Sequence, residues 1–384
     1  MKKLYNTQKE ITSNISKFLK KSFPNIRKTQ LNIIPLIVLG MINSNSSSSN
    51  LIASALKDEF SLVQFDSVIR RIRRLFNNTL FNPYNFYQNI IYYILSNYKV
   101  KHSNNKVHII FDHMFSHDNY SVFMMSMRVG KQGIPLYFKC FKYSNSEAFQ
   151  LSTITEGIDF VNNLFKNTDY KLVFLADRWF DSKKILKYIE DLGHTYCIRA
   201  KGNLKVRVYD NKEKHYIRIN TRDLKSKKYK GTYYENVYLY NDYKCNITVS
   251  KNDGIKEPWI IVTNGNPNEA VRDYSHRFGG IEAIFKNQKS NGFNIEKINN
   301  CTLKSFTSMY SLVCFAITWL VIIGADYCKN SKCYKNVKFE THKIRNGKQV
   351  RIMSLFKLGM LLFKRAFNSP VYIRIPYNFI LYDI

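Results

Sequence analysis

The sequence has few acidic residues for its length. Its 384 residues include 28 Asp and Glu against 59 Lys and Arg, which gives a formal net charge of +31. Because a field of this sign attracts polyanions, the composition favours nucleic acid as the partner; an acidic membrane surface and a ribosomal partner are the alternatives. Apolar residues make up 45% of the chain, which excludes an intrinsically disordered protein and allows two or three domains with their own cores.

The sequence also lacks a secretion signal and a regular cysteine pattern. Residues 1–21 are charged and amphipathic, without the apolar core of a signal peptide. The seven cysteines are odd in number and lack zinc-site spacing, which indicates reduced thiols in an intracellular protein. The stretch that most resembles a membrane span, residues 311–325, is shorter than the roughly 20 apolar residues required. We therefore expect a buried core helix there and no membrane partner.

Residues 1–98 are predicted to form a helical DNA-binding domain. A serine-rich segment at 46–60 predicts a short helix, and residues 61–78 predict a second, amphipathic one. Two short helices of which the second is basic resemble a helix-turn-helix; a solvated surface helix is the alternative. On the second helix the apolar face comprises Val68, Ile69, Ile72, Leu75 and Phe76, and the basic face comprises Arg70, Arg71, Arg73 and Arg74.

From residue 105 the pattern changes to short apolar runs typical of buried strands. Three strands joined in part by the turn "GKQG" precede a helix, a strand, a helix and a fifth strand. This order predicts an α/β fold with an RNase H-like catalytic core at 105–200 and 264–330. Residues 201–263 predict a β-rich, mostly antiparallel insertion. Residues 331–384 predict a basic helical C-terminal region, so that helical regions flank the core.

Three carboxylates are candidates for a metal site. Asp112 and Asp177 end the first and fourth predicted strands, which are neighbours in an RNase H-like sheet, so both should face one pocket. Glu282 follows the insertion on a predicted helix and could close the pocket; an ordinary ion pair with Lys286 one turn on is its alternative. Oxygen ligands without histidine or thiolate suit Mg²⁺, with Mn²⁺ able to substitute. Two such ions can drive phosphodiester cleavage.

Three segments resemble the conserved regions of a known enzyme family. They are "FDH" at 111–113, "ADRWF" at 176–180 and "YSHRFGGIEAIFKNQKSNGF" at 274–293. They look like those of DDE transposases from bacterial insertion sequences, and specifically of insertion-sequence family four, which has a Tyr-Arg-Glu-Lys signature. The resemblance covers residues 105–300 and includes a β-rich insertion before the Glu. It implies a cytoplasmic, nucleoid-associated bacterial enzyme with Asp112, Asp177 and Glu282 as catalytic residues and metal ligands.

The resemblance also assigns DNA contacts. Tyr274, Arg277, Glu282 and Lys289 match the signature, with one residue more between Arg277 and Glu282 than the family has. The Gly279-Gly280 pair can absorb this extra residue as a break between helices. Lys289, seven residues after Glu282, is expected on the same helix face, near a phosphate. Arg178 matches the family's Asp-Arg pattern, with a surface salt bridge as its alternative. Trp259 matches a tryptophan that stacks on a flipped base in hairpin-forming members; its alternative is a core residue.

The leading interpretation is a cut-and-paste transposase. It would cleave double-stranded DNA at terminal inverted repeats and join the freed 3′-OH to target DNA, with or without a hairpin intermediate. Related transposases act as homodimers on paired ends, which the resemblance implies here. The alternatives are a metal-dependent nuclease that does not join strands and a non-catalytic DNA-binding protein descended from a transposase.

Overall fold

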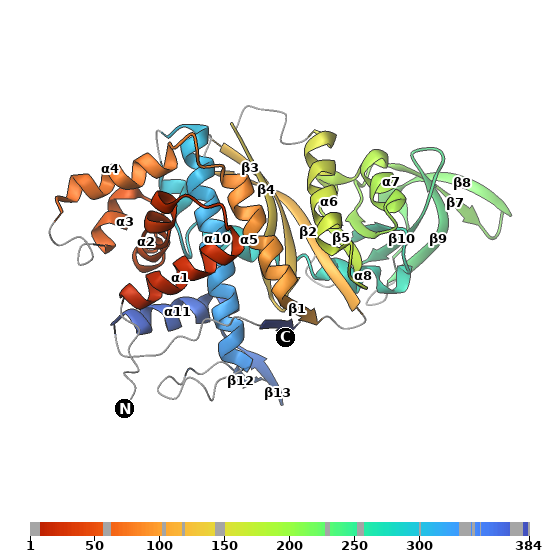
Figure 1. Cartoon of the computed structure of the whole chain (residues 1–384). Helices are drawn as coiled ribbons and strands as arrows, with labels where there is room; N and C mark the ends of the chain where they lie inside the picture. The colour runs from red at the N-terminus through yellow and green to blue at the C-terminus, as the bar shows by residue number, and fades with distance from the viewer. Residues whose placement is uncertain are drawn as a thin grey trace.

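The computed structural model describes residues 8–56, 63–101, 105–116, 120–142, 150–226, 231–251, 257–298, 301–329, 339, 342–345, 347–368 and 379–382. In Figure 1 the helical part lies at one end of the molecule, and the strands of the insertion lie at the other. A large mixed sheet lies between them and continues into the insertion. The helices are α1 (Gln8–Ser22), α2 (Lys28–Ser44), α3 (Ser49–Ala55), α4 (Phe65–Phe76), α5 (Pro83–Asn97), α6 (Leu151–Phe165), α7 (Lys183–Asp191), α8 (Pro267–Ser275), α9 (Ile281–Gln288), α10 (Leu303–Lys329) and α11 (Leu355–Asn368).

The central sheet has ten strands in the order β4-β3-β2-β5-β6-β11-β10-β9-β7-β8. The first and fourth strands of the predicted core, β2 and β5, are parallel neighbours, which confirms their expected adjacency. Gly130 and Lys131 join β3 to β4, where the sequence predicts a hairpin turn. The strands are β2 (Lys106–Ser116), β3 (Tyr120–Val129), β4 (Gln132–Lys142), β5 (Lys171–Ala176), β6 (Thr195–Arg199), β7 (Lys205–Asp210), β8 (His215–Asn220), β9 (Thr232–Leu239), β10 (Tyr243–Ser250) and β11 (Trp259–Thr263).

The insertion strands extend the core sheet. All their pairings are antiparallel, as predicted, and β11 pairs with β6 through Ile261 and Arg199, so the sheet runs without a break from the core into the insertion. The step from β9 to β7 is the narrowest, because these strands are joined through only two residue pairs.

Helices cover both faces of the sheet. Gly157 of α6 packs against Met125, and Glu190 of α7 accepts a hydrogen bond from Tyr243. On the other face, Thr248 bonds to the start of α8, and Ile284 of α9 lies against Gly133. Side chains alternate along each strand, so this second face is the one that carries Asp112.

The helix α10 forms the centre of the helical part. It is apolar and long enough to cross a membrane, but its apolar window is fully buried within the protein, so the predicted core helix is confirmed. It runs from Leu303 to Lys329, well beyond the apolar stretch at 311–325. The α1 helix packs on it through Phe18, whose ring stacks on Phe315 at 5.9 Å. Gly324 of α10 and Gly359 of α11 let these two helices touch backbone to backbone, since a Cβ at either would overlap a carbonyl oxygen.

The prediction of a helical C-terminal region is wrong in part. The described residues after 331 contain α11 but also β12 (His342–Arg345), β13 (Lys348–Arg351) and β14 (Phe379–Tyr382). In the sequence an Asn-Gly pair lies between β12 and β13. Gly347 has φ +70°, a positive φ that two-residue hairpin turns require. The strand β14 pairs in parallel with β1 (Tyr98–Lys101), which immediately follows α5.

Candidate active site

Asp112 and Asp177 come together where the parallel pairing of β2 and β5 ends. Ile110 pairs with Leu175, so continuing this register by two residues places Asp112 beside Asp177 on the same face. Asp177 directly follows β5, as predicted. Asp112 does not end its strand, because β2 continues to Ser116 along β3. Asp112 nevertheless lies at an open edge on the side of β5, because β5 ends at Ala176.

Glu282 reaches this edge through the break between α8 and α9. The α8 helix ends at Ser275, Gly279 has φ +81°, and α9 begins at Ile281, so the predicted helix break is present. Gly280 lies so close to Ile110 that a Cβ would overlap it. Glu282 occupies the first turn of α9, where a negative charge is stabilised by the helix dipole.

All three carboxylates surround the guanidinium of Arg277. Its Nη2 lies 2.6 Å from Asp112 Oδ2 and 3.8 Å from Asp177 Oδ2, and its Nη1 lies 3.2 Å from Glu282 Oε1. Arg277 is only 7% exposed, and its Nε has no hydrogen-bond partner. Three carboxylates against one guanidinium leave a formal charge of −2 (−3 + 1) on the cluster. Glu282 therefore contacts Arg277, a contact that neither its predicted role as a metal ligand nor the alternative pairing with Lys286 anticipated.

Burial shifts the pKa values of Asp112 and Arg277, and attraction between their opposite charges opposes these shifts. Burial raises the pKa of Asp112 above its usual value and the charge of Asp177 adds to the rise, whereas Arg277 opposes it. Burial also disfavours charged Arg277, but the surrounding carboxylates outweigh it and raise the pKa of the guanidinium. The cluster thus already contains one cation and retains an excess of negative charge.

These residues fit a divalent cation. The donors are carboxylate oxygens from three separate elements, which is the ligand type that Mg²⁺ and Mn²⁺ prefer. The residual charge of −2 attracts divalent cations to these oxygen atoms. The group is open to solvent on one side, since the Glu282 side chain is 49% exposed.

Trp259 and Tyr274 lie beside this site in an aromatic cluster. Trp259, at the start of β11, stacks on Phe278 at 5.1 Å with an interplanar angle of 10°, and Tyr274 meets it edge-on at 5.4 Å. Tyr274 is 1% exposed, so in this structure it supports Trp259 and offers no surface to DNA. Burial raises the pKa of Tyr274 to about 12. Phe278 is 40% exposed, so the aromatic cluster is partly open to solvent at this point.

Arg178 and Lys289 lie outside the group of acids in this structure. Arg178 pairs with Glu257 at 3.0 Å, and both side chains are well exposed, which is the surface salt bridge named as its alternative. Lys289 is the residue at which α9 ends, and its ammonium lies 2.7 Å from Glu296. Lys289 was expected on the same helix face as Glu282, and this position is not realised because the helix stops at Gln288.

The arginines of the N-terminal region lie as predicted on α4. Val68, Ile69, Ile72, Leu75 and Phe76 are buried, whereas Arg70, Arg71, Arg73 and Arg74 are exposed. Ser48 precedes α3 at the N-cap position but makes no side-chain capping bond. Figure 1 places α4 in the helical end of the molecule, on the far side of the sheet from the insertion.

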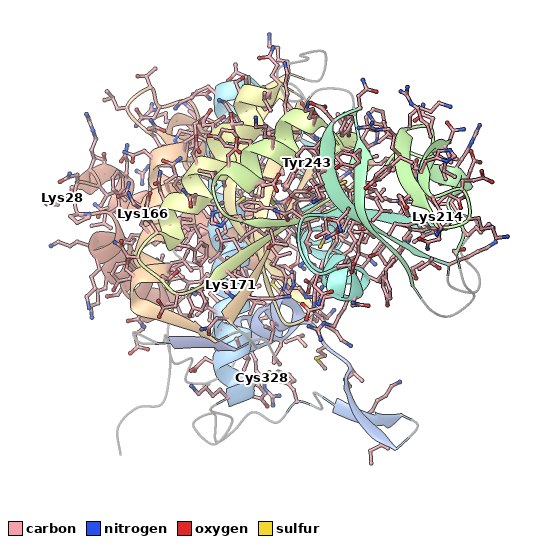
Figure 2. All side chains as sticks on the ribbon, turned by 90° about the vertical axis from the view of Figure 1, so that its right-hand side faces the viewer. Lys28, Lys166, Lys171, Lys214, Tyr243 and Cys328 are labelled. Carbon is pink, nitrogen blue, oxygen red and sulfur yellow. The ribbon has the colours of Figure 1, made fainter. Side chains whose placement is uncertain are left out.

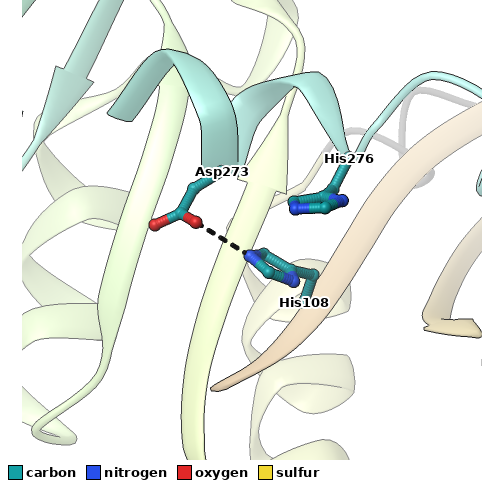
Figure 3. A group of neighbouring side chains, drawn as sticks. All are labelled: His108, Asp273 and His276. Atoms are coloured by element: carbon teal, nitrogen blue, oxygen red, sulfur yellow. Dashed lines mark hydrogen bonds and ion pairs between the residues drawn. The ribbon is translucent and has the colours of Figure 1, made fainter. Parts of the chain in front are cut away.

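A second polar cluster lies between β2 and the C-terminal end of α8 (Figure 3). His108 Nε2 lies 3.1 Å from Asp273 Oδ1, and ligand atoms of His108, Asp273 and His276 all lie within 4.8 Å of one another, as a metal site would require. The ammonium of Lys106 lies 3.2 Å from Asp273 Oδ2 and already balances this carboxylate. Burial opposes ionisation of Asp273, but His108 and Lys106 outweigh it and lower its pKa.

Three further residues at the site were not predicted from the sequence. Phe278 provides half of the stack with Trp259. Arg128 of β3 donates to the carbonyl oxygens of His276 and Phe278, and thereby fixes the segment that carries Arg277. Trp179, two residues after Asp177, is 73% exposed. From the sequence, an apolar side chain next to a strand is expected in the core. Only the exposure of Trp179 in the fold identifies it as a surface residue.

A model of one protein family matches this chain, whereas curated protein sequences do not. No curated protein sequence matches the chain significantly. Among solved structures, a cryo-EM structure of the piggyBac transposase synaptic complex with hairpin DNA matches with a TM-score of 0.44 and 13% identity, over 93% of this chain and 77% of that chain. The family model described as the transposase DDE domain matches residues 99–319, more than half of the 384 residues, and this stretch contains Asp112, Asp177 and Glu282. The chain therefore belongs to the DDE-domain transposase family.

Proposed function

We propose that this protein carries out cut-and-paste DNA transposition as a member of insertion-sequence family four from a bacterium. Membership of the DDE transposase family implies an enzyme that cleaves and joins phosphodiesters with divalent metal. The observation that carries the proposal is the meeting of Asp112, Asp177 and Glu282 around one buried guanidinium, at the point of the central mixed sheet where β5 ends.

Asp112, Asp177 and Glu282 would hold two Mg²⁺ ions. When bound, such ions activate a water or a 3′-OH as the nucleophile and stabilise the leaving oxygen. Arg277 holds the carboxylates in place by neutralising part of their charge, and Arg128 fixes the backbone on either side of Arg277. The aromatic surface of Phe278 and Trp259 lies next to the acids and suits stacking of an unpaired base, as a hairpin route would need.

The basic surface would bind the DNA. The exposed arginines of α4 supply phosphate contacts for the terminal inverted repeat, remote from the acids. Two copies of the chain would hold the paired ends, because DNA relieves the self-repulsion of a protein of charge +31. We place this activity in the bacterial cytoplasm, on the nucleoid.

The test is a cleavage and joining assay on labelled transposon-end DNA with Mg²⁺. Asp112→Asn, Asp177→Asn and Glu282→Gln should each abolish cleavage while the protein still binds DNA, because each removes a charged metal ligand and leaves the basic surface intact. Asp191→Asn, at the exposed end of α7, is the matched control and should cleave normally. Mg²⁺-dependent cleavage by any of the three variants would remove that residue from the site.

The joining step separates transposition from simple nuclease activity. A nuclease on the same core would release cut ends but give no product in which the 3′-OH is linked to target DNA. A non-catalytic descendant would bind ends and cut nothing, with or without metal.

A further inference from the structure

The strands at the tip of the insertion have two chemically distinct faces. Val206, Val208 and Leu239 face inward and are buried, whereas the residues that alternate with them are exposed or half-exposed. The outward face carries mostly basic and tyrosine side chains at its paired positions, and Asn220 lies opposite Lys205. We name these residues the tip strip: Lys205, Arg207, Tyr209, Tyr216, Arg218 and Tyr238.

Strand register shows that these residues form one surface. Tyr209 pairs with Tyr216, and Arg207 pairs with both Arg218 and Tyr238. Lys244 of β10 pairs with Tyr238 and extends the strip by one more cation. Figure 2 views the molecule from the insertion end, and shows nitrogen-tipped side chains across it, with Lys214 marking the turn from β7 to β8.

The charge of the tip strip is not balanced by carboxylates within it. Arg207 and Arg218 both donate to Asn241, through its carbonyl oxygen and its side-chain oxygen respectively, and these acceptors are neutral. The neighbouring acid, Asp242, contacts Lys183 at 2.6 Å. Asn241 thus holds two guanidiniums side by side, and Asp242, which interacts with both Lys183 and Arg207, balances only part of their charge.

The tyrosine rings of the tip strip pack edge to face. Tyr216 meets Tyr209 and Tyr238 edge to face, at interplanar angles of 74° and 75°, and the Arg207 guanidinium lies 4.8 Å from the centre of the Tyr238 ring. The Tyr216 hydroxyl makes one long hydrogen bond, to the carbonyl oxygen of Asn236 at 3.5 Å, and can still accept from or donate to a ligand. Hydroxyls and guanidiniums are the groups that bind phosphates of a DNA backbone.

The tip strip lies on the same pleated face of the sheet as the acids. Asp177 shares its face with Leu175, which pairs with Cys197; Cys197 pairs with Thr263, and Thr263 with Asn246. Asn246 alternates with Lys244 and so leads to the strip. Trp259 is also on this face, because it alternates with Ile261 and Thr263.

We propose that the tip strip binds the phosphate backbone of duplex DNA beside the cleavage site. This inference rests on the proposed function, in that the ligand is the transposon end held by the acids. Five strand spacings separate β5 from β7, which is about 24 Å at roughly 4.8 Å per strand. At about 3.4 Å per base pair the contacts would lie about 7 base pairs from the scissile phosphate. The twist of the sheet rotates the tip strip relative to the acids.

The experiment compares two double variants that lose the same formal charge. Arg207→Ala with Arg218→Ala removes the guanidiniums of the strip, and Lys184→Ala with Lys187→Ala removes two exposed ammonium groups of α7. Binding of a 30-base-pair duplex is measured across salt concentrations without divalent cation. The strip variant should bind at least about tenfold more weakly and lower the slope of log K against log salt by about 2, since each phosphate contact contributes about 0.9. The α7 variant should change neither markedly.

Two further readouts make the result decisive. Tyr209→Phe with Tyr216→Phe should weaken duplex binding, because the hydroxyls are lost while the rings remain. A single-stranded 30-mer should lose less affinity than the duplex in the strip variant. Equal losses in the strip and α7 variants, or a larger loss for single strands, would overturn the proposal. Because no cleavage is measured, failure of the catalytic assignment would leave this result unaffected.

Discussion

Arg277 and Asp112 are 165 residues apart in the sequence and form a buried ion pair, with Nη2 2.6 Å from Oδ2. The same guanidinium contacts Glu282 at 3.2 Å. A cation therefore already stands among the three acids of this transposase, and the protein itself supplies it.

We expect Arg277→Ala to destabilise the metal-free protein. The change leaves the carboxylates facing one another without a cation, and breaking a buried ion pair in this way costs about 3 kcal/mol. Added Mg²⁺ should raise the melting temperature of the variant more than that of the wild type, because Arg277 no longer competes for the carboxylates. Differential scanning calorimetry with and without Mg²⁺ measures both effects.

Arg178→Ala is the matched control for that experiment. It removes an exposed pair with Glu257, so its effect should stay within about 1 kcal/mol and show no Mg²⁺ dependence. If Arg277→Ala had the same melting temperature as the wild type, Arg277 would not stabilise the three carboxylates in the way described.

Asp112→Asn should stabilise the fold at neutral pH while abolishing cleavage. The pKa of Asp112 is raised in the folded state, chiefly by burial, so folding binds the proton and stability falls as pH rises through the range above the unfolded value of 3.8. Asparagine imitates the protonated form and removes this loss. Urea unfolding from pH 3 to 8 should therefore show the variant's advantage growing with pH and vanishing in acid; an advantage independent of pH would contradict this assignment.

Asp273→Asn should behave in the opposite direction. The pKa of Asp273 is lowered by His108 and Lys106 despite its burial, so its contribution to stability is present above the unfolded pKa of 3.8 and is lost as pH falls through the folded pKa. The variant should be less stable than the wild type at neutral pH and converge with it in acid. A deficit that persists at the lowest pH would point to packing rather than charge.

Trp259→Ala should permit the first-strand nick and reduce hairpin formation or its resolution. The reason is that a base turned out of a sharply bent DNA end would lose its stacking partner beside Phe278. Denaturing gels of a labelled end separate nick, hairpin and double-strand product. Should the variant only melt at lower temperature and give normal second-strand products, Trp259 serves the core and the hairpin route loses its support.

Reversing charge on α4 should weaken binding to transposon ends. Arg70→Glu with Arg74→Glu places acids on an exposed face that the proposal assigns to phosphate contacts, whereas the buried face of α4 is unchanged. Footprinting of the terminal repeat measures the effect, and circular dichroism checks that the helix persists. Full protection of the repeat by this variant would exclude α4 from end recognition.

The amino-acid sequence determined the parts of this protein that depend on local pattern. The apolar runs of β2 and β5 each lead to an acid, and strand alternation fixes the face on which that acid lies. The two faces of α4 follow from the spacing of its apolar residues and arginines. The break at Gly279 follows from a glycine pair within an otherwise helical segment, because glycine alone adopts φ +81° without strain.

Only the tertiary structure decided how distant side chains meet. Arg277 was expected to contact DNA, yet packing of the α8–α9 segment against β2 turns it inward onto Asp112 and Glu282. Lys289 was expected near the acids, but α9 stops one residue before it and its ammonium forms an ion pair with Glu296. The tip strip could not be seen along the chain, because its residues come from three strands and become one surface through pairing register. Contacts of this kind depend on which elements lie side by side, and sequence spacing alone does not specify that.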